Sequence, residues 1–201
     1  MGISKNVKQT LINVFDSVLV VVDIQDHFLA KYDKTVSQPV VEKAAWMVKL
    51  AGALNVPVVV MGEDIDNNGT VNQSILDALP DNTKVHNKNS FGLAGEPEIL
   101  ADVESTGRKT TVLIGMETDV CVAQSALGLM ENGYQVVVAK DAVATTPGGD
   151  EIGLNRMHDA GAVISSVKAI HYEWLRTVDN TIEMYSLAPE LEQQEPDSLD
   201  L

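Results

Sequence analysis

The sequence has only one cysteine, no long apolar run and few basic residues, so it lacks the features typical of disulfide-bonded, membrane and nucleic-acid-binding proteins. Its single cysteine, Cys121, cannot form a disulfide within the chain. No apolar run reaches the ~18 residues needed to cross a membrane, and the amino terminus lacks the apolar stretch of a signal peptide. The 14 Lys and Arg residues against 29 Asp and Glu give a net charge of −15, which repels phosphate backbones. We therefore expect a cytoplasmic protein with no nucleic-acid partner and no membrane partner.

The remaining composition is typical of one globular domain. The chain has 201 residues, of which 45% are hydrophobic and 21% are charged, and these values argue against disorder and against a disulfide scaffold. The last sixteen residues carry five acidic side chains and no Lys or Arg. We expect a single domain over residues 1–185, followed by an acidic, mobile tail over residues 186–201.

Short β-branched runs alternate with longer segments of helical spacing, which favours an α/β fold. Runs that are apolar on both faces are typical of buried parallel strands. The pattern predicts a three-layer α/β/α domain of the Rossmann-like type, with a six-stranded, mostly parallel sheet and helices on both faces. The predicted strands are Ser17 to Val22, Val56 to Met61, Thr83 to His86, Thr110 to Ile114, Gln135 to Ala139 and Ala162 to Ser165.

Five segments between these strands have the composition of helices. Three of them stop at a glycine a few residues before the next strand, which is a common way for a helix to end. The predicted helices are Val40 to Leu54, Glu96 to Ser105, Val120 to Asn132, Glu151 to Ala160 and Lys168 to Val178.

The ends of the predicted strands carry an acid, an amine and a thiol. In an open parallel sheet the site lies beyond the carboxyl ends of the strands, so Asp23, Cys121 and a lysine should lie near one edge. Asp23 is placed either as a general base or as a simple turn cap. For the lysine, Lys84 and Lys88 stay open as alternatives, and either could be an ordinary surface residue.

Cys121 lies in the first turn of a predicted helix, and a helix amino terminus lowers the pKa of a thiol by stabilising the thiolate. This setting suits a nucleophile, although most free cysteines are small buried hydrophobes. The pair Asp64 and Asp66 could attract a hard cation, but no histidine is near in the sequence. We expect no metal and no other cofactor.

Three segments resemble the isochorismatase-like cysteine hydrolases. VLVVVDIQDHF resembles the first-strand motif of that family, with its catalytic aspartate, and KNSFGL is similar to the lysine segment of one subgroup. LIGMETDVCVAQSALGLMENGYQVVVAKDAVAT resembles the nucleophile segment. The resemblance covers about Val18 to Val178, implies the isochorismatase-like hydrolase fold, and favours Lys88 over Lys84.

The resemblance implies a catalytic triad and a set of residues around it. The triad would be Asp23 as base, Lys88 as its charged partner and Cys121 as nucleophile. The family has a non-proline cis peptide ahead of the nucleophile, here at Met116 to Glu117, which would direct the N–H groups of Glu117 and Cys121 at an oxyanion. The residues expected to bind the oxyanion or the substrate are Glu117, Thr118, Phe28 and Gln25.

The implied activity is hydrolysis of a small amide-type substrate at a carbon–nitrogen bond, through a covalent intermediate on Cys121. GEDIDNNGTV lacks the histidines of the nicotinamidase metal site, and a cysteine at this position argues against a true isochorismatase. The resemblance also implies a homo-oligomer, with Trp46 and Trp174 buried or at an interface. Two alternatives stay open, a redox-sensing thiol protein and a non-catalytic oligomeric binding protein.

Overall fold

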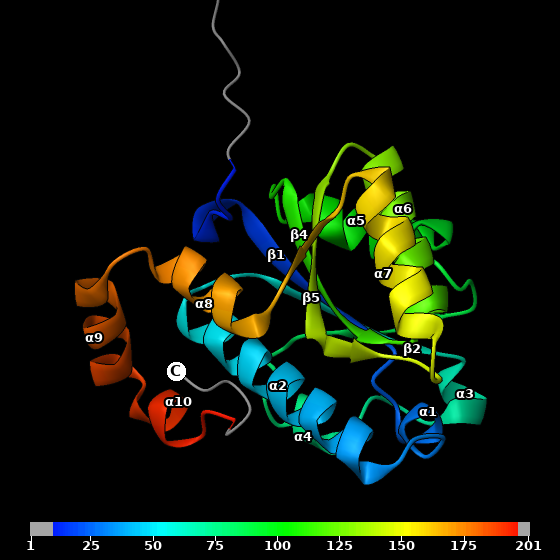
Figure 1. The fold of residues 1–201 in the computed structure, drawn as a ribbon, viewed down its shortest axis with the longest axis horizontal. Coiled ribbons are helices and arrows are strands. Elements are labelled where there is room, and N and C mark those ends of the chain that lie inside the picture. Colours follow the sequence, from blue (N-terminus) through cyan, green and yellow to red (C-terminus); the bar gives the residue numbers. More distant parts are fainter. Residues whose placement is uncertain (1–9, 197–201) are drawn as a thin grey trace, which may run out of the picture.

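The computed structural model describes residues 10 to 196 and confirms the α/β prediction (Figure 1). Six strands form one sheet in the order β3-β2-β1-β4-β5-β6, and every pairing between neighbours is parallel. The strands are β1 Ser17–Val22, β2 Val58–Glu63, β3 Val85–Lys88, β4 Thr110–Met116, β5 Gln135–Ala144 and β6 Val163–Ser165.

Helices cover both faces of this sheet (Figure 1). The helices are α1 Asp26–Leu29, α2 Lys34–Ala53, α3 Ile65–Asn68, α4 Gln73–Leu76, α5 Pro97–Ser105, α6 Ala123–Glu131, α7 Gly149–Ala160, α8 Val167–Leu175, α9 Val178–Leu187 and α10 Pro189–Gln193. Short 3₁₀ turns lie at Val14–Asp16 and Leu93–Gly95, and a π-helical turn at Thr118–Val122 leads into α6.

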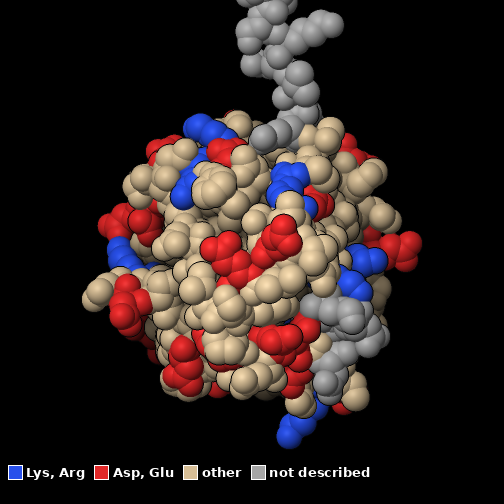
Figure 2. Space-filling view, turned by 90° about the vertical axis from the view of Figure 1, so that its left-hand side faces the viewer, with Lys and Arg blue, Asp and Glu red and all other residues tan. Residues whose placement is uncertain are grey.

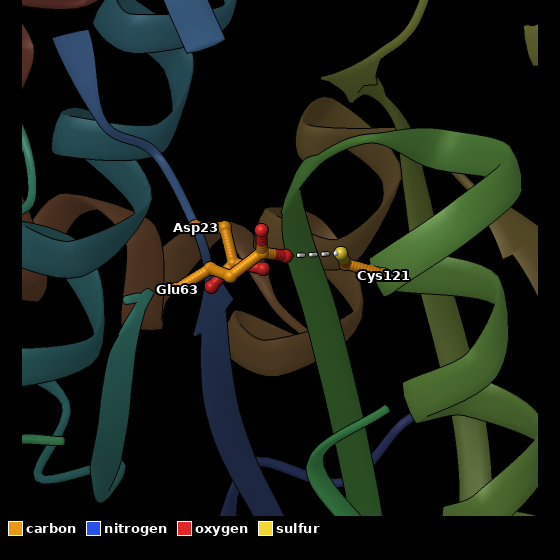
Figure 3. A group of neighbouring side chains, drawn as sticks. All are labelled: Asp23, Glu63 and Cys121. Atoms are coloured by element: carbon orange, nitrogen blue, oxygen red, sulfur yellow. Dashed lines mark hydrogen bonds between the residues drawn. The ribbon is translucent and has the colours of Figure 1, made fainter. Parts of the chain in front are cut away.

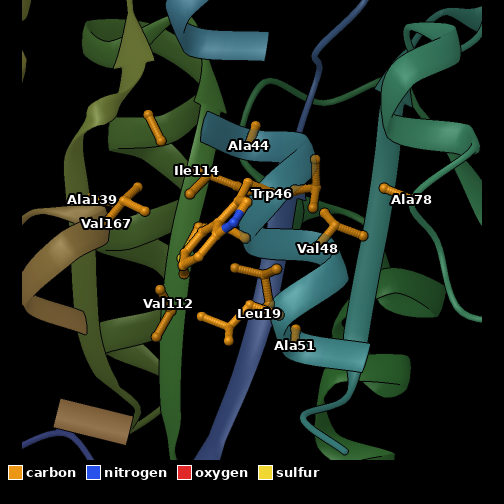
Figure 4. Close-up of a cluster of buried hydrophobic side chains, with 14 of the residues drawn as sticks. Leu19, Ala44, Trp46, Val48, Ala51, Ala78, Val112, Ile114, Ala139 and Val167 are labelled. Carbon is orange, nitrogen blue, oxygen red and sulfur yellow. The ribbon is translucent and has the colours of Figure 1, made fainter. Parts of the chain in front are cut away.

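The central strand β1 shows why the sheet must be covered on both sides. Its six residues, SVLVVV, are all fully buried. Because side chains alternate along a strand, Leu19 and Val21 pack with α2 and α8, whereas Val18, Val20 and Val22 pack with α5 and α6. Figure 4 shows the first of these two cores, with Trp46 of α2 lying over Leu19 and the neighbouring strands.

Several predicted boundaries are corrected. The predicted strands Val56 to Met61 and Thr83 to His86 each lie two residues further on, as β2 and β3. The helix expected from Val120 starts instead as the π-helical turn, where the Val122 N–H donates to the Glu117 carbonyl five residues back. Because β3 is shifted, its last residue is Lys88, and the lysine therefore reaches the carboxyl edge of the sheet.

The acidic segment expected to be a tail from residue 186 is in part packed against the domain. Residue 186 lies within α9, and α10 follows it directly. Leu191 is only 1% exposed, and its carbonyl accepts a hydrogen bond of 2.9 Å from the indole N–H of Trp46. The prediction of a tail rested on the acidic side chains, whereas the apolar side chains between them pack against the domain. Residues 197–201 lie outside the described part.

Both tryptophans are buried, at 2% exposure each, and each indole N–H finds an acceptor. Trp174 donates to the hydroxyl of Ser17, at 3.1 Å, as Trp46 does to Leu191. Within residues 10 to 196, no helix is long and apolar enough to span a membrane. Acidic side chains are spread across the face shown in Figure 2, as the net charge of −15 leads one to expect.

Candidate active site

Asp23, Lys88 and Cys121 come together at the carboxyl edge of the sheet. Asp23 directly follows β1, Lys88 ends β3, and Cys121 lies in the turn between β4 and α6. Asp23 has a φ of 51°, a left-handed conformation that aspartate tolerates better than most residues. Its own N–H donates to the Met61 carbonyl of β2, which fixes the point where the chain leaves the sheet.

Lys88 is fully buried and forms an ion pair with Asp23. Its Nζ lies 2.9 Å from Asp23 Oδ2, and neither side chain is exposed to solvent. The same ammonium donates to the carbonyls of Ser90 at 2.9 Å and Phe91 at 3.1 Å. The buried ammonium thus has two carbonyl acceptors and a carboxylate of opposite charge beside it, which is the usual condition for burying a lysine.

Glu96 holds the loop that supplies those two carbonyls. One of its oxygens, Oε1, accepts the N–H groups of Asn89 at 2.8 Å and Ser90 at 2.6 Å. Burial raises the pKa of Glu96, but the hydrogen bonds from Ser90 and Asn89 outweigh that effect and lower it overall. The Glu96 carboxylate therefore fixes the loop whose carbonyls, those of Ser90 and Phe91, accept hydrogen bonds from Lys88.

A fourth side chain, Glu63, completes the cluster, and the sequence analysis did not assign it a role. The Cys121 thiol donates to Glu63 Oε2 at 3.3 Å, and Figure 3 shows the two side chains meeting from opposite sides of the strand ends. Glu63 Oε2 is also 3.7 Å from Lys88 Nζ. One signal could have found it: Glu63 is the last residue of β2 and pairs in register with Lys88.

The thiol and the buried carboxyl depart from their ordinary pKa values in the same direction. Burial raises the pKa of Asp23 to about 6, against the opposing effect of the Lys88 ammonium. Burial also raises the pKa of the Cys121 thiol well above its usual range, and the Asp23 charge raises it further. The expectation of a lowered thiol pKa is therefore wrong, because desolvation and two carboxylates outweigh the helix amino terminus and the ammonium.

The same cluster contains three possible metal ligands. One ligand atom each of Asp23, Glu63 and Cys121 lies within 4.8 Å of the others. The Lys88 ammonium, however, already lies against both carboxylates and supplies the positive charge there. Among the described residues, Asp64 and Asp66 belong to no such group, and both carboxylate oxygens of Asp64 accept from Asn67.

Gln25, which was expected to contact the substrate, instead uses its side-chain amide in hydrogen bonds to the backbone of the protein. It is fully buried, and its amide accepts from the Glu63 N–H at 2.7 Å. The same amide donates to the carbonyls of Glu63 at 2.9 Å and Gly69 at 2.5 Å. A buried primary amide needs several partners, and here the backbones of Glu63, at the end of β2, and of Gly69, after α3, provide them.

The other three expected contact residues lie around the turn before Cys121. The peptide bond between Met116 and Glu117 is cis, as predicted. The Glu117 carboxylate accepts from Tyr32 at 2.8 Å, and the fully buried Thr118 donates its hydroxyl to Asp150 at 2.5 Å. The Thr118 side chain is thus already satisfied. Phe28 is 8% exposed, and the ammonium of Lys31 lies over its ring, 4.5 Å from the ring centroid.

Known proteins share this fold and part of this sequence. The family model described as "Isochorismatase domain" matches residues 17–169. The "Secreted isochorismatase effector Isc1" of Phytophthora sojae is 35% identical over 169 residues, which are 82% of this chain and 79% of that protein.

Two solved structures resemble the whole described fold. YcaC from Pseudomonas aeruginosa, solved with hexane-2,5-diol and covalent acrylamide, gives a TM-score of 0.86 at 22% identity, over 96% of this chain and 95% of that one. The YcaC gene product from Escherichia coli, described as an octameric hydrolase of unknown specificity, gives 0.80 at 21% identity, over 92% and 94% of the two chains.

Proposed function

Because the chain belongs to the isochorismatase family, we propose that it is a cysteine hydrolase acting on the carbon–nitrogen bond of a small amide-type substrate. One observation supports this proposal most strongly. A buried Asp23–Lys88 ion pair lies beside the thiol of Cys121 at the carboxyl edge of a parallel sheet, where such folds bind their ligands. The short distances among the three residues that the resemblance implies as a triad support this proposal.

The two raised pKa values suit a nucleophile that is activated only when it reacts. With a pKa of about 6, Asp23 is an effective proton acceptor near neutral pH. Cys121 rests as a thiol, so its proton passes to Asp23 as the sulfur attacks the carbonyl carbon. The C–N bond then breaks, and the leaving amine takes the proton from Asp23. Water hydrolyses the resulting thioester and returns the free thiol.

Lys88 keeps Asp23 available for this proton transfer. Its ammonium opposes the effect of burial on the Asp23 pKa, and without it the carboxyl would hold its proton more tightly. We further propose, from the sequence resemblance, that the peptide N–H groups of Glu117 and Cys121 stabilise the oxyanion. Phe28 and the Glu117 side chain are proposed to border the substrate; Thr118 is proposed to contribute through its backbone alone.

A redox-sensing role is less well supported than hydrolysis. Reactive sensor thiols combine a low pKa with exposure to solvent. Cys121 is only 5% exposed, and its pKa is raised. A non-catalytic binding protein is also less well supported, since a binding pocket gains nothing from burying an ion pair against a thiol. The location in the cytoplasm stays a prediction.

We also propose that the protein forms a homo-oligomer. The YcaC structure from Escherichia coli is described as octameric, and this chain exposes several large apolar side chains around residues 10–15 and α9. A groove of about 760 Å³ lies between these segments, and its lining includes Phe15 and Leu187, each 78% exposed. Patches of this kind are typical of surfaces that another subunit covers. Sedimentation that shows only a 21.7 kDa species at micromolar concentration would contradict this proposal.

The function is tested by a screen of small amides and carbamoyl compounds, with released ammonia or amine as the signal. Three variants accompany the wild type: Cys121→Ala, Asp23→Asn and Lys88→Met. We expect each to lower hydrolysis by about 10²-fold or more, as loss of a nucleophile or general base does. Lys84→Met is the matched control, because Lys84 directly precedes β3, the strand that ends at Lys88, and 64% of its side chain is exposed. Full activity of Cys121→Ala would refute the proposal.

A further inference from the structure

Glu63 is the one acid of the active-site cluster that the reaction above leaves without a task. Its Oε2 accepts the thiol proton of Cys121 at 3.3 Å, so it contacts the reacting atom directly. It is also the carboxylate nearer to solvent, since 19% of its side chain is exposed while Asp23 has none. A carboxylate that contacts the sulfur and is also exposed to solvent can accept a hydrogen bond from a water molecule next to the sulfur.

The buried side chain of Gln25 holds the backbone of Glu63 in place. Gln25 accepts the N–H of Glu63 and donates to its carbonyl, at 2.7 and 2.9 Å, so both backbone groups of this residue are fixed. Glu63 also ends β2 beside Lys88 in the parallel register, which places its side chain at the carboxyl edge of the sheet. This support keeps the carboxylate at the thiol while Asp23 remains bound to Lys88.

The contact between Glu63 and the thiol changes when the enzyme becomes acylated. In the resting protein, Oε2 is occupied by the S–H group. Once the sulfur carries an acyl group it has no proton to donate, and Oε2 loses that hydrogen bond. The partly exposed Glu63 carboxylate then lies beside the thioester and is free to accept a hydrogen bond from another donor. Water is the donor available from the solvent side, and water is the reactant of the second step.

We propose that Glu63 is the general base of thioester hydrolysis, whereas Asp23 is the base of acylation. This inference rests on the proposed function, because it needs an acyl group on Cys121. Glu63 takes a proton from water, and the water oxygen bonds to the thioester carbon. The C–S bond then breaks, and the sulfur receives that proton from Glu63 along the contact they share at rest. The product acid leaves, and the resting hydrogen bond forms again.

The test uses p-nitrophenyl acetate, which acetylates an active-site thiol and releases p-nitrophenol. With enzyme in excess, p-nitrophenol release measures acylation. After rapid removal of the probe, the loss of the acetyl group from the intact protein, followed by mass spectrometry, measures hydrolysis of the thioester. The variants are Glu63→Gln, the neighbouring control Asp64→Asn, Asp23→Asn and Cys121→Ala. Asp64→Asn removes one nearby negative charge without changing any group that contacts the sulfur.

We expect Glu63→Gln to acetylate at a rate within a few fold of the wild type and to lose the acetyl group about 10²-fold more slowly. Added hydroxylamine, which attacks a thioester without a general base, should restore most of that loss. Asp64→Asn should match the wild type in both steps, and Asp23→Asn should fail at acylation. A merely structural role for Glu63 would not produce rescue by hydroxylamine.

Two results would overturn the inference and leave the proposed function intact. The first is an acetyl group that leaves Glu63→Gln as fast as it leaves the wild type. The second is an equal slowing of both steps that hydroxylamine does not relieve. A different result defeats the proposed function itself: Cys121→Ala acetylates as the wild type does, or the acetyl group of the wild type lies on another residue.

Discussion

Replacement of Lys88 by methionine should destabilise the fold more than most single substitutions do. Methionine has a similar length but no charge, so Asp23 loses its partner at 2.9 Å inside a region with no solvent exposure. Removing one member of a buried ion pair costs about 3 to 5 kcal/mol. The carbonyls of Ser90 and Phe91 also lose their donor, and each unsatisfied acceptor costs about 1 to 3 kcal/mol. We expect a loss of about 4 kcal/mol or more at pH 7.

The pH dependence of this loss has a definite sign. In the wild type the Asp23 pKa rises from 3.8 when unfolded to about 6 when folded. Protonation of Asp23 therefore favours the folded state, fully below pH 3.8, and this contribution is lost as the pH rises to about 6. Lys88 lowers this pKa, so in Lys88→Met the folded value moves above 6 and the loss continues to higher pH.

Between pH 6 and pH 7 the variant should thus lose more stability than the wild type, whose Asp23 is already about half ionised at pH 6. One pH unit with one extra bound proton corresponds to about 1.4 kcal/mol. The wild type itself loses about 0.4 kcal/mol over this range, so the difference in unfolding free energy between the two proteins should be smaller at pH 6 than at pH 7 by up to about 1 kcal/mol. Urea unfolding at equal protein concentration measures it, with the buried Trp46 and Trp174 as fluorescent reporters.

Lys84→Met supplies the matched control for this experiment. Its ion pair with Glu98 spans 3.5 Å between side chains that are 64% and 86% exposed, so we expect a change within about 0.5 kcal/mol at both pH values. A loss below about 1 kcal/mol in Lys88→Met at pH 7 would refute the reasoning, as would a difference that stays constant or grows toward pH 6.

Three further predictions concern the groups around this pair. Gln25→Ala should lower the free energy of unfolding by about 2 kcal/mol, because three hydrogen bonds of a buried amide are lost; an unchanged urea midpoint would contradict it. Gly115→Ala should cost about 3 kcal/mol or more, since a Cβ there would lie 2.0 Å from the Val22 carbonyl oxygen at a φ of 137°; a wild-type midpoint would refute this account. Iodoacetamide should alkylate Cys121 slowly near pH 7 and faster as the pH rises, because burial raises the thiol pKa; a rate already at its plateau near pH 7 would show that the thiol is ionised.

The fold could be predicted from the sequence because its signals are local and repeated. Each strand that is apolar on both faces, such as Ser17–Val22, requires cover on both sides of the sheet, and the helical segments between the strands supply it. The exact bounds of β2 and β3 could not be predicted, because nothing in the local pattern sets the register of these strands against their neighbours. The C-terminal helices were missed because Leu191 and Ala188 are buried by contacts that are distant in sequence.

Of the candidate site, the sequence indicated the residues that directly follow or end strands. Asp23, Lys88 and Cys121 lie together as the motifs implied. Glu63 was missed because a single glutamate after a strand usually ends in solvent, and only the tertiary fold shows that it reaches the sulfur. The direction of the Cys121 pKa shift was predicted wrongly for a related reason: a helix amino terminus can be read from sequence, whereas desolvation cannot.

The proposed hydrolysis depends on an acyl group that forms on Cys121 during turnover. The most direct measurement stops the reaction of the wild type with an amide found in the screen while turnover is in progress, and maps the digested protein by mass spectrometry. We expect one acyl group on the peptide that contains Cys121. This group should be absent from Cys121→Ala, which should also have lost hydrolysis. Turnover by Cys121→Ala at the wild-type rate, with no acyl group on this peptide in the wild type, would contradict it.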